Sequence, residues 1–122
     1  MTATPTPTPF RCEVIPERAC VRVLPAGELD LETAPALERT VRELFESGFA
    51  DIVLDLAELD FIDSTGLHLI LTLQSAAESF GCRFRVRPGS PAVQRIFELT
   101  GTLAVVAFDA HARPSRRVWT RR

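Results

Sequence analysis

The feature that most constrains the fold is a short apolar run, IVLDL, at residues 52–56. A run of this length that hardly alternates is typical of a parallel strand buried on both faces. Before it, Leu37, Val41 and Phe45 recur at helical spacing. After it, residues 63–80 carry a second helical pattern. A buried strand between two amphipathic helices predicts an α/β domain with a mostly parallel sheet.

Turn and cap residues place the other elements. Pro35 suits the first turn of the first helix, and Gly48 suits its end. A break at residues 16–18 makes the first two strands a hairpin, which we expect residues 25–27 (PAG) to end. In chain order, the predicted elements are strands 12–15 and 19–24, helix 34–47, strand 52–56, helix 63–80, strand 83–87, helix 90–99 and strand 104–108.

This β-β-α-β-α-β-α-β order predicts a mixed, mostly parallel β-sheet with right-handed crossovers, an N-terminal antiparallel hairpin and helices packed on it. The predicted core residues are Leu54, Leu56, Leu67, Leu71, Val86 and Val105. The 122 residues fit a single domain, which we place at residues 11–109. The Thr/Pro repeat predicts a disordered leader at residues 1–10, and the arginine-rich end predicts a mobile tail at residues 110–122.

Charge is distributed unevenly along the chain. Residues 1–110 contain nine arginines and 16 acidic residues, whereas residues 111–122 contain five arginines and no acid. The acidic body argues against a domain that binds nucleic acid. All basic residues are arginine, and the absence of lysine excludes a P-loop lysine and a Schiff-base lysine.

No cofactor, metal or catalytic residue is predicted. The two histidines, His68 and His111, belong to no HExxH motif or His/Cys cluster, and the sequence has no GxGxxG or GxSxG motif. Three cysteines without a CxxC pair suggest neither a disulfide framework nor a zinc knuckle. No apolar run approaches the ~20 residues of a membrane span, and the start of the chain does not resemble a secretory signal. We therefore expect a cytoplasmic protein.

The segment DFIDSTGL, at residues 60–67, stands between the buried strand and the second helix. Asp63 or Ser64 is placed to cap the exposed backbone N–H groups where the helix begins. Ser64 is also placed at the carboxyl end of a parallel strand, where α/β sheets usually present their sites. A helix cap and a switchable modification site therefore both remain open from the residues alone.

A polar stripe extends from this serine along the second helix. Its members, three or four residues apart, are Ser64, His68, Thr72, Ser75 and Ser79. Short, mostly uncharged groups are cheap to desolvate, as a docking surface requires, although a thin exposed seam without a partner has the same pattern. A phosphate on Ser64 would add about −1.5 to −2 charge near Asp60 and Asp63, which repel it. We expect it to release a partner without refolding the domain.

Three separated blocks of sequence carry a resemblance to a known family. They are GELD at residues 27–30, DSTGL at residues 63–67, and SPAV at residues 90–93 leading to ELTG at residues 98–101. Over roughly residues 11–109 the chain resembles the bacterial anti-sigma factor antagonists, which are single-domain members of the STAS fold. Any one block is a weak signal, but the three in this order are specific.

The resemblance implies a function and a set of site residues. The serine after the aspartate of the central block, here Ser64, would be phosphorylated by a cognate anti-sigma factor that is a serine kinase. The unphosphorylated protein would hold the kinase and free the sigma factor, and a serine phosphatase would restore this form. The domain would have no catalysis of its own, because the ATP belongs to the kinase. Asp30 would lie near Ser64 in the docking surface, and Asp63 would shape the phosphorylation loop.

From the resemblance and the polar stripe together, the predicted partner-binding residues are Asp30, Asp63, Ser64, Thr65, Gly66, His68, Thr72 and Ser75. His68 is a departure, because family members commonly have glycine after the central leucine. A bulky titratable group there would alter partner choice or make docking depend on pH near ~6.5, or it would be an exposed imidazole without a role.

Two other functions remain as alternatives. One is a STAS module that is not switched by phosphorylation, such as a scaffold or a subunit of a transport complex. The other is a small enzyme or nucleotide-binding protein that uses the acids around Asp30, Asp60 and Asp63. The missing lysine and the lack of a histidine constellation make this second alternative the weaker one.

Overall fold

The computed structural model describes residues 9–109, so the predicted tail at 110–122 and nearly all of the predicted leader lie outside the described residues. The strands are β1 (Arg11–Pro16), β2 (Val21–Leu29), β3 (Asp51–Asp55), β4 (Leu59–Ile62) and β5 (Arg83–Arg87), and the helices are α1 (Ala34–Glu46), α2 (Ser64–Ser79) and α3 (Pro91–Leu99). None of these helices is long and apolar enough to cross a membrane.

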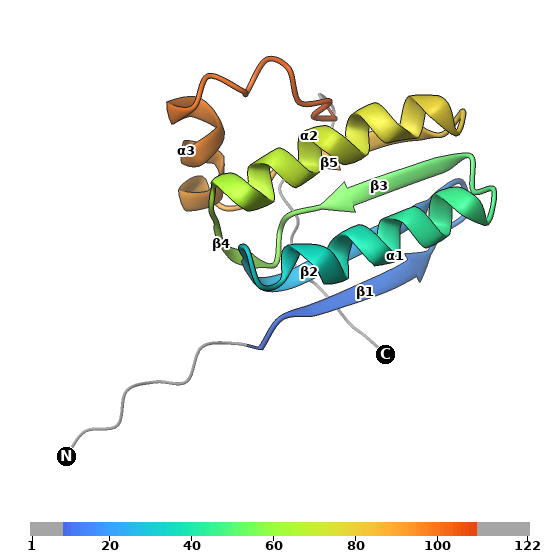
Figure 1. Ribbon diagram of the computed structural model, residues 1–122, viewed down its shortest axis with the longest axis horizontal. Helices are drawn as coiled ribbons and strands as arrows, with labels where there is room; N and C mark the ends of the chain where they lie inside the picture. The colour runs from blue at the N-terminus through green and yellow to red at the C-terminus, as the bar shows by residue number, and fades with distance from the viewer. Residues whose placement is uncertain (1–8, 110–122) are drawn as a thin grey trace.

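The sheet is mixed, as predicted, with strand order β1-β2-β3-β5 and with β4 paired to β2. β1 runs antiparallel to β2, whereas every other pairing is parallel. Figure 1 shows α1 and α2 side by side across one face of this sheet, with α3 at the end where β4 lies. The α/β class, the antiparallel hairpin and all three helices are therefore confirmed.

Strand β2 is longer than the sequence predicted, because residues 25–27 do not end it. β2 pairs with β3 through residues 21–23 and with β4 through residues 27–29. Pro25 lies between the segment of β2 that pairs with β3 and the segment that pairs with β4. The N–H that proline lacks is therefore not needed for a hydrogen bond to either strand. Gly27 has a positive φ of 98° at a register shift beside Glu28, so it forms a bulge rather than the end of the strand.

Strand β4 is not predicted by the sequence, which indicates no element between the strand at 52–56 and the helix at 63–80. It has only four residues, of which Leu59 and Ile62 are buried while Asp60 and Phe61 are exposed. That pattern matches neither strict alternation nor a continuous apolar run, so periodicity does not reveal it. Its existence depends on β2, which extends beyond β3 and offers a free edge.

The predicted last strand, 104–108, is wrong. Its only sheet pairing is an isolated bridge between Phe108 and Val86. The side chain of Gln74 in α2 takes the backbone groups that a strand would use: its Nε2 donates to Val105 O at 2.8 Å, and its Oε1 accepts from Ala107 N at 2.7 Å. Val105 is consequently 58% exposed, and the predicted core position there is filled by Val106.

The main core lies between the sheet and the helices. Of the predicted core residues, Leu54, Leu56, Leu67 and Val86 are buried, whereas Leu71 is only partly buried. The largest fully buried side chain is Phe97 of α3, which contacts Phe108 edge-to-face at 5.1 Å between ring centroids. This contact fixes the segment after α3 to the domain.

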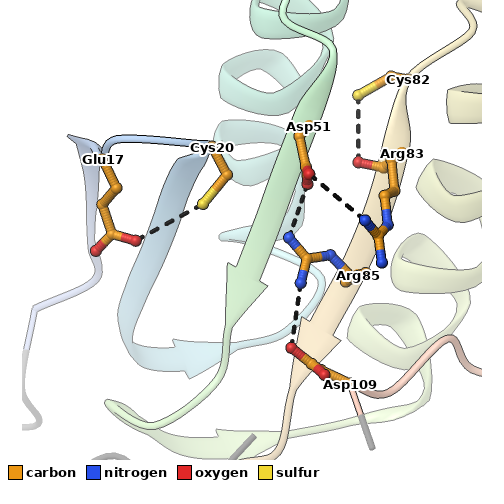
Figure 2. Close-up of polar contacts among 7 residues, drawn as sticks. All are labelled: Glu17, Cys20, Asp51, Cys82, Arg83, Arg85 and Asp109. Carbon is orange, nitrogen blue, oxygen red and sulfur yellow. Dashed lines mark hydrogen bonds and ion pairs between the residues drawn. The ribbon is translucent and has the colours of Figure 1, made fainter. Parts of the chain in front are cut away.

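The opposite face of the sheet carries ion pairs. Arg85 bonds Asp51 at 2.9 Å and Asp109 at 3.2 Å, which ties β5 to β3 and to the end of the described chain (Figure 2). Arg22 bonds Asp55 at 3.2 Å, and Asp55 is the one buried acidic residue in the range 9–109. These ion pairs lie within the domain, although Arg85 Nε is buried without a hydrogen-bond partner among the described residues.

Candidate functional site

Two strand ends meet where the site begins. In the parallel register of β2 and β4, Leu29 lies opposite Ile62. The backbone N–H of Asp63 extends this pairing by donating to Leu29 O at 3.2 Å. The two loops that follow start at Asp30 and at Asp63, so they leave the sheet side by side at the carboxyl ends of β2 and β4.

The structure decides which residue caps α2. Asp63 has extended backbone angles (φ −110°, ψ −172°), and its Oδ1 accepts a hydrogen bond from Gly66 N at 3.0 Å. Asp63 is thus the N-cap, and Ser64 is the first residue of the helix. The side chain of Ser64 is exposed, and its hydroxyl makes no hydrogen bond within residues 9–109. Its hydroxyl is free to react because the aspartate before it performs the capping.

Gly66 sets the position of this helix start. A Cβ added to it would lie 2.8 Å from both Leu29 Cγ and Leu29 O, and 2.9 Å from Ile62 Cγ1. Only glycine lets the first turn of α2 rest directly on the ends of β2 and β4. Gly66 is buried, so we expect it to act on docking by placing Ser64 rather than by touching a partner.

Asp30 organises the neighbouring loop. Its Oδ1 accepts hydrogen bonds from the backbone N–H of Glu32 at 3.0 Å and of Thr33 at 3.1 Å. Thr33 Oγ1 accepts in turn from Asp30 N at 2.9 Å. These bonds form a tight turn before α1, which holds the side chain of Leu31 in solvent, 73% exposed.

A surface groove separates α1 from α2. Its first part, about 330 Å³, is lined by Leu31, Ala34, Pro35, Glu38, Thr65, His68, Leu69 and Thr72. Its second part, about 440 Å³, is lined by Arg42, Leu71, Thr72, Ser75, Ala76 and Ser79. Because Thr72 belongs to both parts, we treat them as one surface, the α1–α2 groove. The polar stripe predicted from His68 to Ser79 forms its α2 wall.

The two charged residues of the α1–α2 groove neutralise each other. Arg42 Nε bonds Glu38 Oε2 at 2.9 Å in an i,i+4 pair on α1. The groove therefore offers apolar and small polar groups over most of its length. Two further acids, Asp30 and Asp63, directly follow the paired ends of β2 and β4 and do not line the groove.

Sequence reasoning missed the α1 side of this surface. Leu31, Pro35 and Glu38 line the groove, yet none was singled out as a site residue. A large apolar residue in an otherwise polar loop, as in the run DLET at residues 30–33, was the available signal. Of the eight predicted partner-binding residues, Thr65, His68, Thr72 and Ser75 line the groove. Asp63, Ser64 and Gly66 form the cap and first turn of α2, and Asp30 lies in the loop before α1.

The acids of the alternative enzymatic site, Asp30, Asp60 and Asp63, have other positions and contacts in the structure. Asp30 and Asp63 both accept backbone hydrogen bonds that fix helix starts, and Asp60 is exposed on β4. Across residues 9–109, no three His, Cys, Asp or Glu side chains come together in a group that could hold a metal ion.

Comparison with known proteins gives a consistent family. Residues 14–106 match the family model described as "Mlab, STAS domain". An anti-sigma-B factor antagonist of Staphylococcus aureus is 33% identical over 75 residues, which are 62% of this chain and 69% of that protein. An anti-sigma factor antagonist from Mycobacterium paratuberculosis has a crystal structure that matches with a TM-score of 0.75 at 25% identity, over 84% of this chain and 86% of that chain.

The structure of the Bacillus cell fate determinant SpoIIAA in its phosphorylated form shares the fold, with a TM-score of 0.60 and 22% identity over 84% of this chain and 93% of that chain. The family model covers more than half of the chain, and the staphylococcal relative exceeds 30% identity over more than two thirds of its length. The chain belongs to the STAS-domain family, among the bacterial anti-sigma factor antagonists.

Proposed function

We propose that this protein binds a cognate anti-sigma factor serine kinase, that this binding frees a sigma factor, and that phosphorylation of Ser64 ends it. The observation that carries the proposal is the free, exposed hydroxyl of Ser64 beside the capping Asp63. The protein is then a binding partner and a substrate in the cytoplasm, and a serine phosphatase returns it to the binding form. The staphylococcal and mycobacterial relatives, both anti-sigma factor antagonists, support this function.

The charges around Ser64 explain how a phosphate would act. It would add about −1.5 to −2 charge at the helix N-terminus, which favours an anion by roughly 0.3–1 kcal/mol. Asp30 and Asp63 directly follow the paired ends of β2 and β4, and their negative charges oppose the phosphate. Because Ser64 is exposed and packs against nothing that must move, the modified domain keeps its fold.

The α1–α2 groove supplies the rest of the docking surface. Small polar groups on α2 are cheap to desolvate, and Leu31 offers an exposed apolar side chain at the rim. A kinase bound across this surface covers Ser64, and a phosphate there must be desolvated against the partner. That cost exceeds the favourable helix-dipole term, so the modified protein is released.

The test is affinity capture with two baits, Ser64→Ala and Ser64→Glu, from the lysate of the source cell. We expect a serine kinase on the Ala bait and its loss from the Glu bait. An Ala92→Glu bait is the matched control, because Ala92 is exposed in the first turn of α3 and receives the same charge at a different helix start. This control should keep the kinase.

Each alternative function predicts a different outcome. An unswitched STAS scaffold or transport-complex subunit would hold the same proteins on both baits, with no kinase among them. If a kinase binds equally to the Ala and Glu baits, the switch at Ser64 is refuted even though the partner is correct. A nucleotide-binding enzyme would bind ATP or Mg²⁺ by itself, which calorimetry on the purified chain measures directly.

A further inference from the structure

Strand β1 is the outer strand of the sheet, and one of its edges carries no partner strand among the described residues. Within the described residues, β1 pairs only with β2, so its other edge faces solvent. Exposed edges of this kind are templates for pairing with another strand. The alternation of backbone hydrogen bonds shows which groups of β1 are available for that.

The hairpin turn fixes this alternation. Glu17 N donates to Cys20 O at 2.8 Å, and the register pairs Pro16 with Val21. Because hydrogen-bonded and non-hydrogen-bonded pairs alternate in an antiparallel ladder, the odd-numbered residues of β1 bond to β2. The N–H and C=O groups of Cys12 and Val14 therefore point away from the sheet. No hydrogen bond to these groups occurs within residues 9–109.

A second copy of β1 could pair with this edge only in a few antiparallel registers, because even-numbered residues must face even-numbered residues. Charge distinguishes between these registers. Pairing Cys12 with Val14 of the other copy would set Glu13 opposite Glu13, which like-charge repulsion disfavours. Pairing Cys12 with Cys12 of the other copy sets Arg11 opposite Glu13 in both directions. Neither Arg11 nor Glu13 has an ion-pair partner in the described part of the chain.

The other side of the strand fits the same register. Phe10, Cys12 and Val14 lie on the helix-bearing face, where Phe10 and Cys12 pack against the core and Val14 is 42% exposed. The register sets each Val14 beside Phe10 of the other copy, so both apolar side chains gain cover. The two Cys12 thiols meet at the symmetry axis as neutral groups, because burial raises the pKa of Cys12 to about 11.

We propose that the protein forms a symmetric dimer in which β1 pairs antiparallel with β1 of a second copy, centred on Cys12. The two sheets then join into one, with reciprocal Arg11–Glu13 ion pairs on one face and reciprocal Val14–Phe10 contacts on the other. The interface uses no residue of the Ser64 site or of the α1–α2 groove, so it is independent of the proposed switch.

Charge exchange tests the register without disturbing the fold. Sedimentation velocity over a range of concentrations should show dimers for the unaltered chain and for the double variant R11E/E13R. The single variants R11E and E13R should each weaken the dimer by about tenfold or more. An equimolar mixture of the two single variants should form a heterodimer, since one chain presents two carboxylates and the other two guanidinium groups.

Amide hydrogen exchange tests the backbone part of the proposal. Protection of the Cys12 and Val14 amides should rise with protein concentration, whereas the Glu13 amide, which bonds to β2, should be protected at every concentration. A chain that is monomeric at all concentrations overturns the proposal. So does a dimer whose strength is the same in R11E, E13R and the double variant, because that dimer uses another surface.

Discussion

Ser64 and Ser90 stand at the starts of two helices in one small domain, yet the structure uses them differently. Ser90 is the N-cap of α3, where its hydroxyl accepts a hydrogen bond from Val93 N at 3.3 Å and Pro91 follows at the first helical position. Ser64 comes one position later relative to its helix, because Asp63 is the N-cap of α2. One hydroxyl is therefore engaged in capping, and the other is free.

The difference separates a serine whose hydroxyl caps a helix from one whose hydroxyl is exposed to solvent. An aspartate placed before the serine takes the capping hydrogen bond and leaves the hydroxyl to solvent. The third helical position differs as well, since Gly66 allows α2 to sit on the strand ends while Val93 of α3 fills a buried site. Loss of Ser90 should affect stability, and loss of Ser64 should affect only recognition.

Among the substitutions considered, Gly66→Ala should lower the free energy of unfolding the most. In an ordinary helix interior, alanine is more stable than glycine by roughly 0.5–1 kcal/mol. Here the new methyl group would lie 2.8 Å from the Leu29 carbonyl oxygen, so we expect a net destabilisation of about 1–3 kcal/mol in urea unfolding. A variant that is more stable than the parent would show that α2 does not rest on β2 as described.

Removing the N-cap side chain of α2 or of α3 should lower the stability by the next largest amount, and by the same amount at each helix. Asp63→Ala and Ser90→Ala each remove an N-cap acceptor, so each should lower the free energy of unfolding by about 1 kcal/mol. Asp63→Asn is the control, because it keeps an acceptor oxygen at the same place. If Asp63→Ala leaves the stability unchanged, Ser64 has taken over the capping and the contrast between the two serines fails.

The smallest effect should be that of Ser64→Ala on stability. An exposed hydroxyl without a hydrogen bond inside residues 9–109 contributes little, so the change should stay within about 0.5 kcal/mol. Thermal unfolding of Ser64→Ala and Ser90→Ala side by side measures the contrast directly. Equal losses in the two variants would mean that Ser64 is a structural residue after all.

The sequence predicts those parts of the fold that local signals determine. Pro35 and Gly48 bracket α1, and Asp63 marks the start of α2, so both helices lie where these signals place them. Strand β4 was not predictable from its own residues, because it exists only where β2 extends past β3. The mistaken last strand has a similar cause: its apolar run is strand-like, but Gln74, distant in sequence, takes its backbone groups.

The candidate site divides in the same way. Its α2 side follows from helical spacing, which groups His68, Thr72 and Ser75 on one stripe. Its α1 side depends on how two helices pack and on the turn that Asp30 stabilises, so the exposure of Leu31 was not predictable. The identity of the cap was also undecided between Asp63 and Ser64 until the backbone geometry settled it.

If the hydroxyl of Ser64 controls partner binding, its phosphorylation must weaken the complex with the kinase. The kinase recovered on the Ser64→Ala bait is incubated with the unaltered chain and ATP, the modified residue is mapped by mass spectrometry, and the affinity of the kinase is measured before and after. We predict a single phosphate on Ser64, none on Ser90, and a loss of affinity of roughly tenfold or more. A phosphate on Ser64 that leaves the affinity unchanged would show that this hydroxyl does not control binding.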